Sequence, residues 1–131
     1  MRTHTVDRLA AFVLGLEGLA VAALVVWQIW ALAVGDTGSV QSAVALMVLT
    51  AVGAVAVLAF AVATWRGLSW GRSGGVVTQL LILAVALGAV TGAYASPTTG
   101  LALAIPGLIA LVLLLFAVRA AGRQARGPAS E

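Results

Sequence analysis

Uncharged apolar stretches separated by short polar breaks set the pattern of this chain. Four such stretches cover approximately residues 9–34, 40–65, 74–95 and 99–118. Each is long enough to supply the roughly 20 residues with which a helix crosses about 30 Å of hydrocarbon. The period-two polarity of membrane-barrel strands is absent. The pattern therefore predicts an all-α fold, a four-helix transmembrane bundle with short loops that forms a single integral membrane domain.

The breaks between the stretches contain residues that end helices or start them. The first break, Gly35–Ser39, is a cluster of Gly, Asp, Thr and Ser, and the third, Ser96–Thr99, contains a proline. Both breaks are too short to hold a further domain. After the fourth stretch we expect residues 119–131 to form a cytoplasmic tail without regular structure.

Composition supports the membrane prediction and excludes several classes of site. Of the 131 residues, 63% are hydrophobic and 8% are charged, whereas soluble domains have about 25% charged residues. There is no cysteine and one histidine, His4. Disulfide scaffolds, thiol chemistry and clusters of histidine or cysteine ligands are therefore excluded or disfavoured. We expect a protein that is not an enzyme, with no catalytic residue, metal site or cofactor.

The arginines predict the orientation of the bundle. They occur before the first stretch, in the second connection and after the fourth stretch: Arg2, Arg8, Arg66, Arg72, Arg119, Arg123 and Arg126. Four spans place all of them on one side, and the positive-inside rule makes that side cytoplasmic. We expect a multi-pass protein of the bacterial cytoplasmic membrane with both termini inside. Single arginines along a membrane face suit anionic lipid headgroups, and we expect no nucleic-acid partner.

The first stretch has an alternative interpretation as a secretory signal. The sequence Ala31–Ala33 has the small-x-small form of a cleavage site. However, the apolar run is about twice as long as a usual signal core, and Trp27, Gln28 and Trp30 stand immediately before the site. We favour a retained membrane span.

Glu17 is the one ionisable residue within a predicted span. It lies about 12 Å along the first helix, at a depth where a carboxylate is costly, so it should face the bundle interior. Gln28 follows Glu17 after eleven residues, almost three turns, so the two side chains lie on the same stripe of the first helix. Gln79 and Thr78 lie at a similar depth in the third helix. These four residues form a candidate intramembrane polar site.

Two interpretations of this candidate site remain open. Glu17 could bind a proton, a cation or an amine, as the acidic groups of transporters do. Alternatively, a neutral Glu17 could form a hydrogen bond with Gln79 or a backbone carbonyl and hold two helices in register. We favour the structural interpretation, because transport relays normally use several acidic groups and this chain has one at membrane depth.

The second connection is a candidate loop for anionic lipid headgroups, through Arg66, Trp70, Arg72 and Ser73. Glycines and Ser73 before a helix, together with two guanidinium groups, could hold a phosphate. The alternative is a tight turn anchored at the interface, in which the tryptophans lie at headgroup level and Ser73 caps the third helix. We favour the anchored turn.

Two resemblances add expectations. The segments Glu17–Gly18, Trp65–Arg72 and Thr78–Leu81 resemble those of small four-helix integral membrane proteins of actinobacteria, a family that implies this topology but no activity. The architecture also resembles that of small multidrug resistance transporters, which have a single essential glutamate in the first helix, matched by Glu17. The arginine bias toward one orientation departs from the best-known of those transporters, and their aromatic binding residues are not recognisable.

The expected function is that of an accessory or interaction subunit of a membrane complex. Its partners would be the lipid bilayer and either another membrane protein or further copies of this chain, for which Gly88 and Gly92 offer a weak small-residue motif. The alternative is a small proton-coupled transporter that uses Glu17.

Overall fold

The computed structural model describes residues 2–127. It contains the helices α1 (Arg2–Ala33), α2 (Val40–Trp65), α3 (Ser69–Thr91) and α4 (Pro97–Arg126), and this part of the chain contains no strand. All four helices are long enough and apolar enough to cross a membrane. The predicted all-α bundle of four membrane helices is confirmed.

Two helix boundaries differ from the predicted spans in ways that matter for function. Helix α3 begins at Ser69, so Trp70, Arg72 and Ser73 belong to the helix and not to a loop before it. Helix α4 continues to Arg126, so residues 119–126 are helical where we expected an irregular tail, and residues 128–131 lie outside the described residues. The apolar pattern marks where hydrocarbon would end, whereas Arg and Ala readily continue a helix into water.

Glycines end the first two helices in the same way. Gly35 and Gly67 have φ values of 74° and 75°, a left-handed conformation that glycine adopts without steric cost. The amide of Gly67 donates to the carbonyl of Thr64, and the amide of Leu68 donates to that of Ala63, the two bonds of a Schellman motif. These caps allow α1 and α2 to end within short turns.

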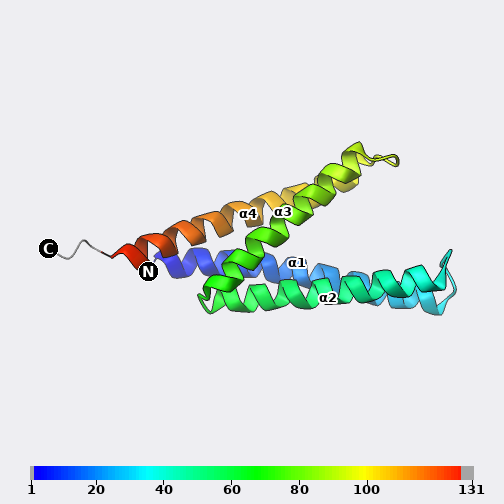
Figure 1. The fold of residues 1–131 in the computed structure, drawn as a ribbon, viewed down its shortest axis with the longest axis horizontal. Helices are drawn as coiled ribbons and strands as arrows, with labels where there is room; N and C mark the ends of the chain where they lie inside the picture. Colours follow the sequence, from blue (N-terminus) through cyan, green and yellow to red (C-terminus); the bar gives the residue numbers. More distant parts are fainter. Residues whose placement is uncertain (1, 128–131) are drawn as a thin grey trace.

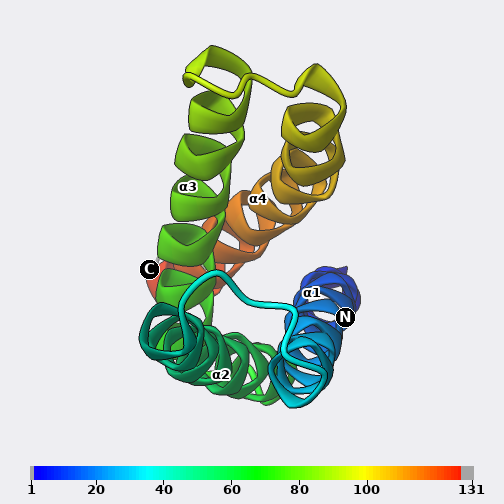
Figure 2. The same cartoon turned by 90° about the vertical axis from the view of Figure 1, so that its right-hand side faces the viewer.

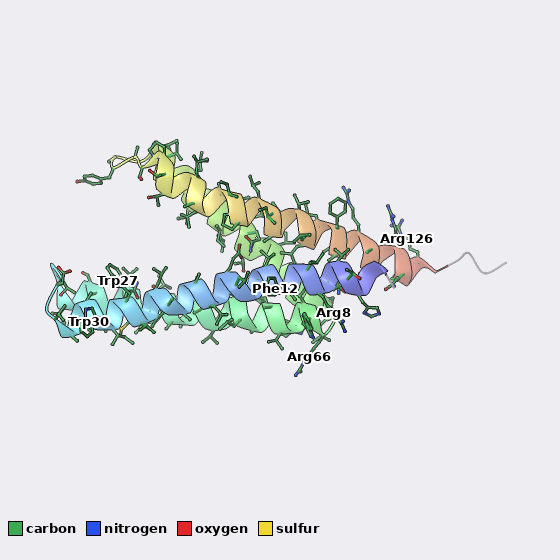
Figure 3. All side chains as sticks on the ribbon, turned by 180° about the vertical axis from the view of Figure 1, so that it is seen from behind. Arg8, Phe12, Trp27, Trp30, Arg66 and Arg126 are labelled. Carbon is green, nitrogen blue, oxygen red and sulfur yellow. The ribbon has the colours of Figure 1, made fainter. Side chains whose placement is uncertain are left out.

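The four helices form two hairpins that meet at one end and diverge toward the other. Figure 1 shows α1–α2 and α3–α4 together near both chain termini and apart at the two opposite loops, and Figure 2 views the diverging ends. We call the shared end the arginine end, because Arg8, Arg66 and Arg126 lie there, whereas Trp27 and Trp30 lie at the other end (Figure 3).

The buried core lies toward the arginine end, where all four helices are close. Its central cluster contains side chains from three helices: Ala10, Leu14, Val57, Ala61 and Leu114. Gly75 of α3 completes it, since a methyl group there would meet the tips of Leu14 and Leu114. By contrast, no residue between 19 and 53 is buried, so the half of the first hairpin that is far from the arginine end packs only within itself.

Two glycines at the start of α3 let that helix cross α2 closely. A methyl group on Gly71 would overlap the backbone of Thr64 and the side chain of Ala63, and one on Gly74 would overlap the ring of Phe60. Without side chains at these positions, the backbones approach to a distance that no larger residue allows. This crossing places α3 against α2 at the arginine end, from where the Gln79 side chain contacts Glu17 of α1.

Replacing Gly71 with Ala should therefore destabilise the fold. We expect the free energy of unfolding to fall by about 1–3 kcal/mol, because the crossing must open to admit the methyl group. Titration of the purified protein from mild detergent into SDS, followed by tryptophan fluorescence, measures the change. The control is Gly88→Ala, where no neighbouring atom lies within 4 Å and the change should be neutral or stabilising by up to about 1 kcal/mol. Equal losses in the two variants would contradict the close crossing.

Candidate functional site

Glu17 and Gln79 form the polar contact that joins the two hairpins. The Gln79 Nε2 group donates to Glu17 Oε2 at 2.5 Å, linking α1 to α3 across 62 positions of sequence. Gln79 has no exposed surface, and Glu17 is half-buried. The structure therefore brings together the two residues that the sequence analysis placed at a similar depth.

Glycines of two helices flank this pair. Gly18, next to Glu17, packs against Leu58 of α2, whereas a methyl group on Gly15 would have no neighbouring atom within 4 Å. On α4, Gly107 lies beside Gln79, and a methyl group there would stand 3.5 Å from Gln79 Oε1. The pair thus joins α1 to α3, and a glycine of α4 lies next to its glutamine.

One oxygen of each side chain in the pair has no hydrogen-bond partner among the described residues. These atoms are Oε1 of Glu17 and Oε1 of Gln79, and both are buried. A neutral Glu17 carries one hydroxyl donor, and a carboxylic acid can donate to an amide oxygen while accepting from the same amide group. If Glu17 carries a proton on Oε1, this hydroxyl can donate to Gln79 Oε1, and both oxygens then take part in a hydrogen bond.

Gln28 belongs to a different contact from the one that the sequence analysis expected. Its Nε2 group donates to Thr50 Oγ1 on α2 at 3.2 Å, and Thr50 Oγ1 donates to the carbonyl of Leu46 at 2.7 Å. Gln28 does share a helix with Glu17, but eleven residues, or about 16 Å, separate them along the axis. Because the hairpins diverge over that distance, Gln28 meets α2 and is not part of the Glu17 site.

Thr78 is also separate from the polar pair. Its hydroxyl donates to the carbonyl of Gly74 at 2.8 Å, one turn earlier in α3, so the donor is used within its own helix. A second threonine, Thr64, is fully buried near the crossing with Gly71, and its hydroxyl has no partner among residues 2–127. Nothing in the sequence distinguishes Thr64 from the other threonines of the apolar stretches, such as Thr50 and Thr78, whose hydroxyls bond to their own helices.

The candidate headgroup residues are divided between internal contacts and the surface. The Arg72 guanidinium donates to the carbonyl of Gly67 at 3.0 Å and lies 3.7 Å from the carboxylate of Asp7 on α1. The side chains of Arg72 and Asp7 are only 11% and 13% exposed. Arg72 therefore ties the turn to the start of α1, while Arg66 and Ser73 are exposed.

Aromatic contacts reinforce the same end of the bundle. The Arg8 guanidinium lies over the Trp65 ring at 5.2 Å from its centroid, and the rings of Phe60 and Trp70 meet edge to face with centroids 6.0 Å apart. Arg8 and Trp65 join α1 to α2, and Phe60 and Trp70 join α2 to α3. Ser73 does not cap α3, because the helix begins before it at Ser69.

Two residues that complete these contacts, Asp7 and Thr50, were not expected from the sequence. Asp7 precedes the first apolar stretch and was not distinguishable from a solvated charge, and Thr50 resembles any hydroxyl that bonds to its own helix. For metal binding, no group of three or more His, Cys, Asp or Glu side chains that could hold an ion occurs in the described part of the chain.

Replacing Gln79 with Leu should weaken the contact between the hairpins. The variant removes the donor to Glu17 at similar side-chain volume, and we expect a loss of about 1–2 kcal/mol in the free energy of unfolding. The double variant Glu17→Leu/Gln79→Leu should recover much of that loss, since no buried polar group is then left without its partner. SDS titration of the four proteins in the cycle measures the coupling. Strictly additive losses would show that the two side chains do not stabilise each other.

The Asp7–Arg72 contact gives a second prediction. Arg72→Gln should lower the free energy of unfolding by about 1–3 kcal/mol, because it removes a charge-assisted bond and leaves Asp7 without its cation. The exposed Arg66 provides a control with the same change in charge, and Arg66→Gln should stay within about 0.5 kcal/mol of the unmodified protein. The prediction fails if both variants unfold at the same SDS fraction.

Comparison with protein families, characterised proteins and solved structures found no match. The two resemblances described above therefore remain expectations drawn from the sequence.

Proposed function

We propose that this chain is a non-enzymatic accessory subunit of a complex in the bacterial cytoplasmic membrane. The proposal includes an orientation, in which the arginine end faces the cytoplasm. Its support is that the described arginines of the two termini and of the α2–α3 turn share one end, where the positive-inside rule can act on them together. The tryptophans at the other end would lie at the opposite membrane surface.

The observation that carries the proposal is the unpacked half of the first hairpin. From residue 19 to residue 53 no side chain is buried, and large apolar groups such as Leu24 and Leu49 are 52% and 69% exposed. Helices in a bilayer gain little by hiding apolar groups from lipid and associate through side-chain packing. Two helices that leave the bundle with all their outer faces unpacked are available to pack against a helix of another protein. We call residues 19–53 the free arm.

The polar pair supports the same proposal. Glu17 is engaged with Gln79 inside the chain, as a residue that holds helices in register would be. Among residues 2–127, Asp7 and Asp36 are the other acids, and they lie near the two ends of the first hairpin's helices. No second carboxyl therefore lies at the depth of Glu17 in this part of the chain.

Photo-crosslinking tests the proposed role of the free arm. A photoreactive residue in place of Leu24 or Leu49 should give a discrete protein adduct in native membranes, identified by mass spectrometry. The same residue in place of Leu87 or Leu101, which are equally exposed on the second hairpin, should give mainly lipid adducts. The absence of protein adducts from the free arm, with purification of the chain alone from mild detergent, would reject the accessory role.

A proton-coupled transporter that uses Glu17 is the second candidate function. It is favoured by the oxygens of Glu17 and Gln79 that have no partner among the described residues, which are buried at the contact between α1 and α3. In proteoliposomes with a lipophilic amine as the probe, wild-type proton flux that Glu17→Gln abolishes, with partner association unchanged, would replace the accessory role by transport. Absence of flux from the wild type, with a membrane complex that co-purifies, would remove the transporter.

A further inference from the structure

A groove at the arginine end combines an apolar floor with two guanidinium groups. It has a volume of about 510 Å³ and runs between the start of α1 and the last turns of α4. Val6, Leu113 and Phe116 supply its apolar wall, and Arg119 and Arg123 stand at its end toward the chain terminus. The lining thus changes from apolar to cationic along one direction.

A second, smaller groove of about 120 Å³ adjoins the first. Val112 and Leu115 line it, and it shares Phe116 and Arg119 with the larger groove. Phe116 and Arg119 therefore border both grooves, and the other residues of the smaller groove are apolar. Two adjoining grooves that share one cation offer separate apolar surfaces to the two acyl chains of a single lipid.

No carboxylate of the described chain neutralises these two arginines. Neither guanidinium group has an ion pair or hydrogen bond with another residue in the 2–127 range. Asp7 faces Arg72, Glu17 is bonded to Gln79 deeper in the bundle, and Asp36 lies in the loop at the opposite end. Among residues 2–127, the groove therefore carries two positive charges with no carboxylate against them.

The spacing of these residues along α4 also fits a lipid at a membrane surface. Leu113 and Arg123 are ten residues apart, which is about 15 Å along the helix axis. Phe116 lies about 4.5 Å deeper than Arg119 at the same rise per residue. A phosphate held by the arginines would have its glycerol and the first methylene groups beside Phe116.

We propose that this double groove binds one anionic phospholipid, with its phosphate on Arg119 and Arg123 and its acyl chains on either side of Phe116. The inference goes beyond the proposed accessory role and requires only that the arginine end lies at a membrane surface. It also moves the expected headgroup contact from the α2–α3 turn to α4, because Arg72 is engaged with Asp7.

Native mass spectrometry of the full chain in mild detergent tests the site, with phosphatidylglycerol and phosphatidylcholine of identical chains as probes. We expect one phosphatidylglycerol retained at concentrations where phosphatidylcholine is lost. Arg119→Gln/Arg123→Gln should weaken phosphatidylglycerol binding roughly thirtyfold, since each arginine near a membrane surface contributes a factor of about five. The control Arg66→Gln/Arg126→Gln has the same charge change outside both grooves and should bind within about threefold of wild type.

A third variant separates the groove from general electrostatics. Leu113→Trp keeps every arginine but fills the apolar channel, and it should lose the lipid while retaining the helical circular dichroism of wild type. Inorganic phosphate at millimolar concentration should not displace the lipid. Equal loss in the two double variants, full binding by Leu113→Trp, or displacement by phosphate alone would each overturn the proposal.

Discussion

The close crossing of α3 over α2 is the constraint on which the rest of the structure depends. It is possible because Gly71 and Gly74 present no side chain to α2, so the backbone of one helix lies against the other. Once α3 is held there, Gly75 admits Leu14 and Leu114 into a shared core. In a bilayer this kind of fit, and not the removal of apolar surface from water, is what holds helices together.

The crossing also determines which polar groups can meet. It brings Gln79 to Glu17, and the bond between them joins hairpins that otherwise touch mainly near the arginine end. Farther along, where the hairpins have diverged, the Gln28 side chain donates a hydrogen bond to Thr50 within its own hairpin. The position of each polar residue relative to the crossing therefore decides whether it links the hairpins or strengthens one of them.

Much of this fold follows from the sequence, because membrane spans are encoded by long uncharged runs that few other structures tolerate. The Glu17–Gln79 contact could be expected from depth alone, since a carboxyl group in hydrocarbon needs a polar partner and few were available. The role of Arg72 could not be predicted, because an arginine near a membrane surface has many possible partners and the sequence does not show that Asp7 is within reach. The continuation of α4 beyond the apolar stretch could not be predicted either, since charged residues mark the edge of the hydrocarbon and not the end of a helix.

The two hairpins meet near the arginine end and diverge from there, so a change in the angle between them displaces their far ends most. Gln79 belongs to the contact between the hairpins, and Thr91 ends α3 twelve residues, or about 18 Å, farther along the helix axis. A change of about 10° in the angle between the hairpins would therefore displace the far end of α3 by about 3 Å, while the contact at Gln79 shifts by a small fraction of that. The far ends of the free arm and of the second hairpin are therefore the parts of the molecule whose separation depends most on the angle at which the two hairpins meet.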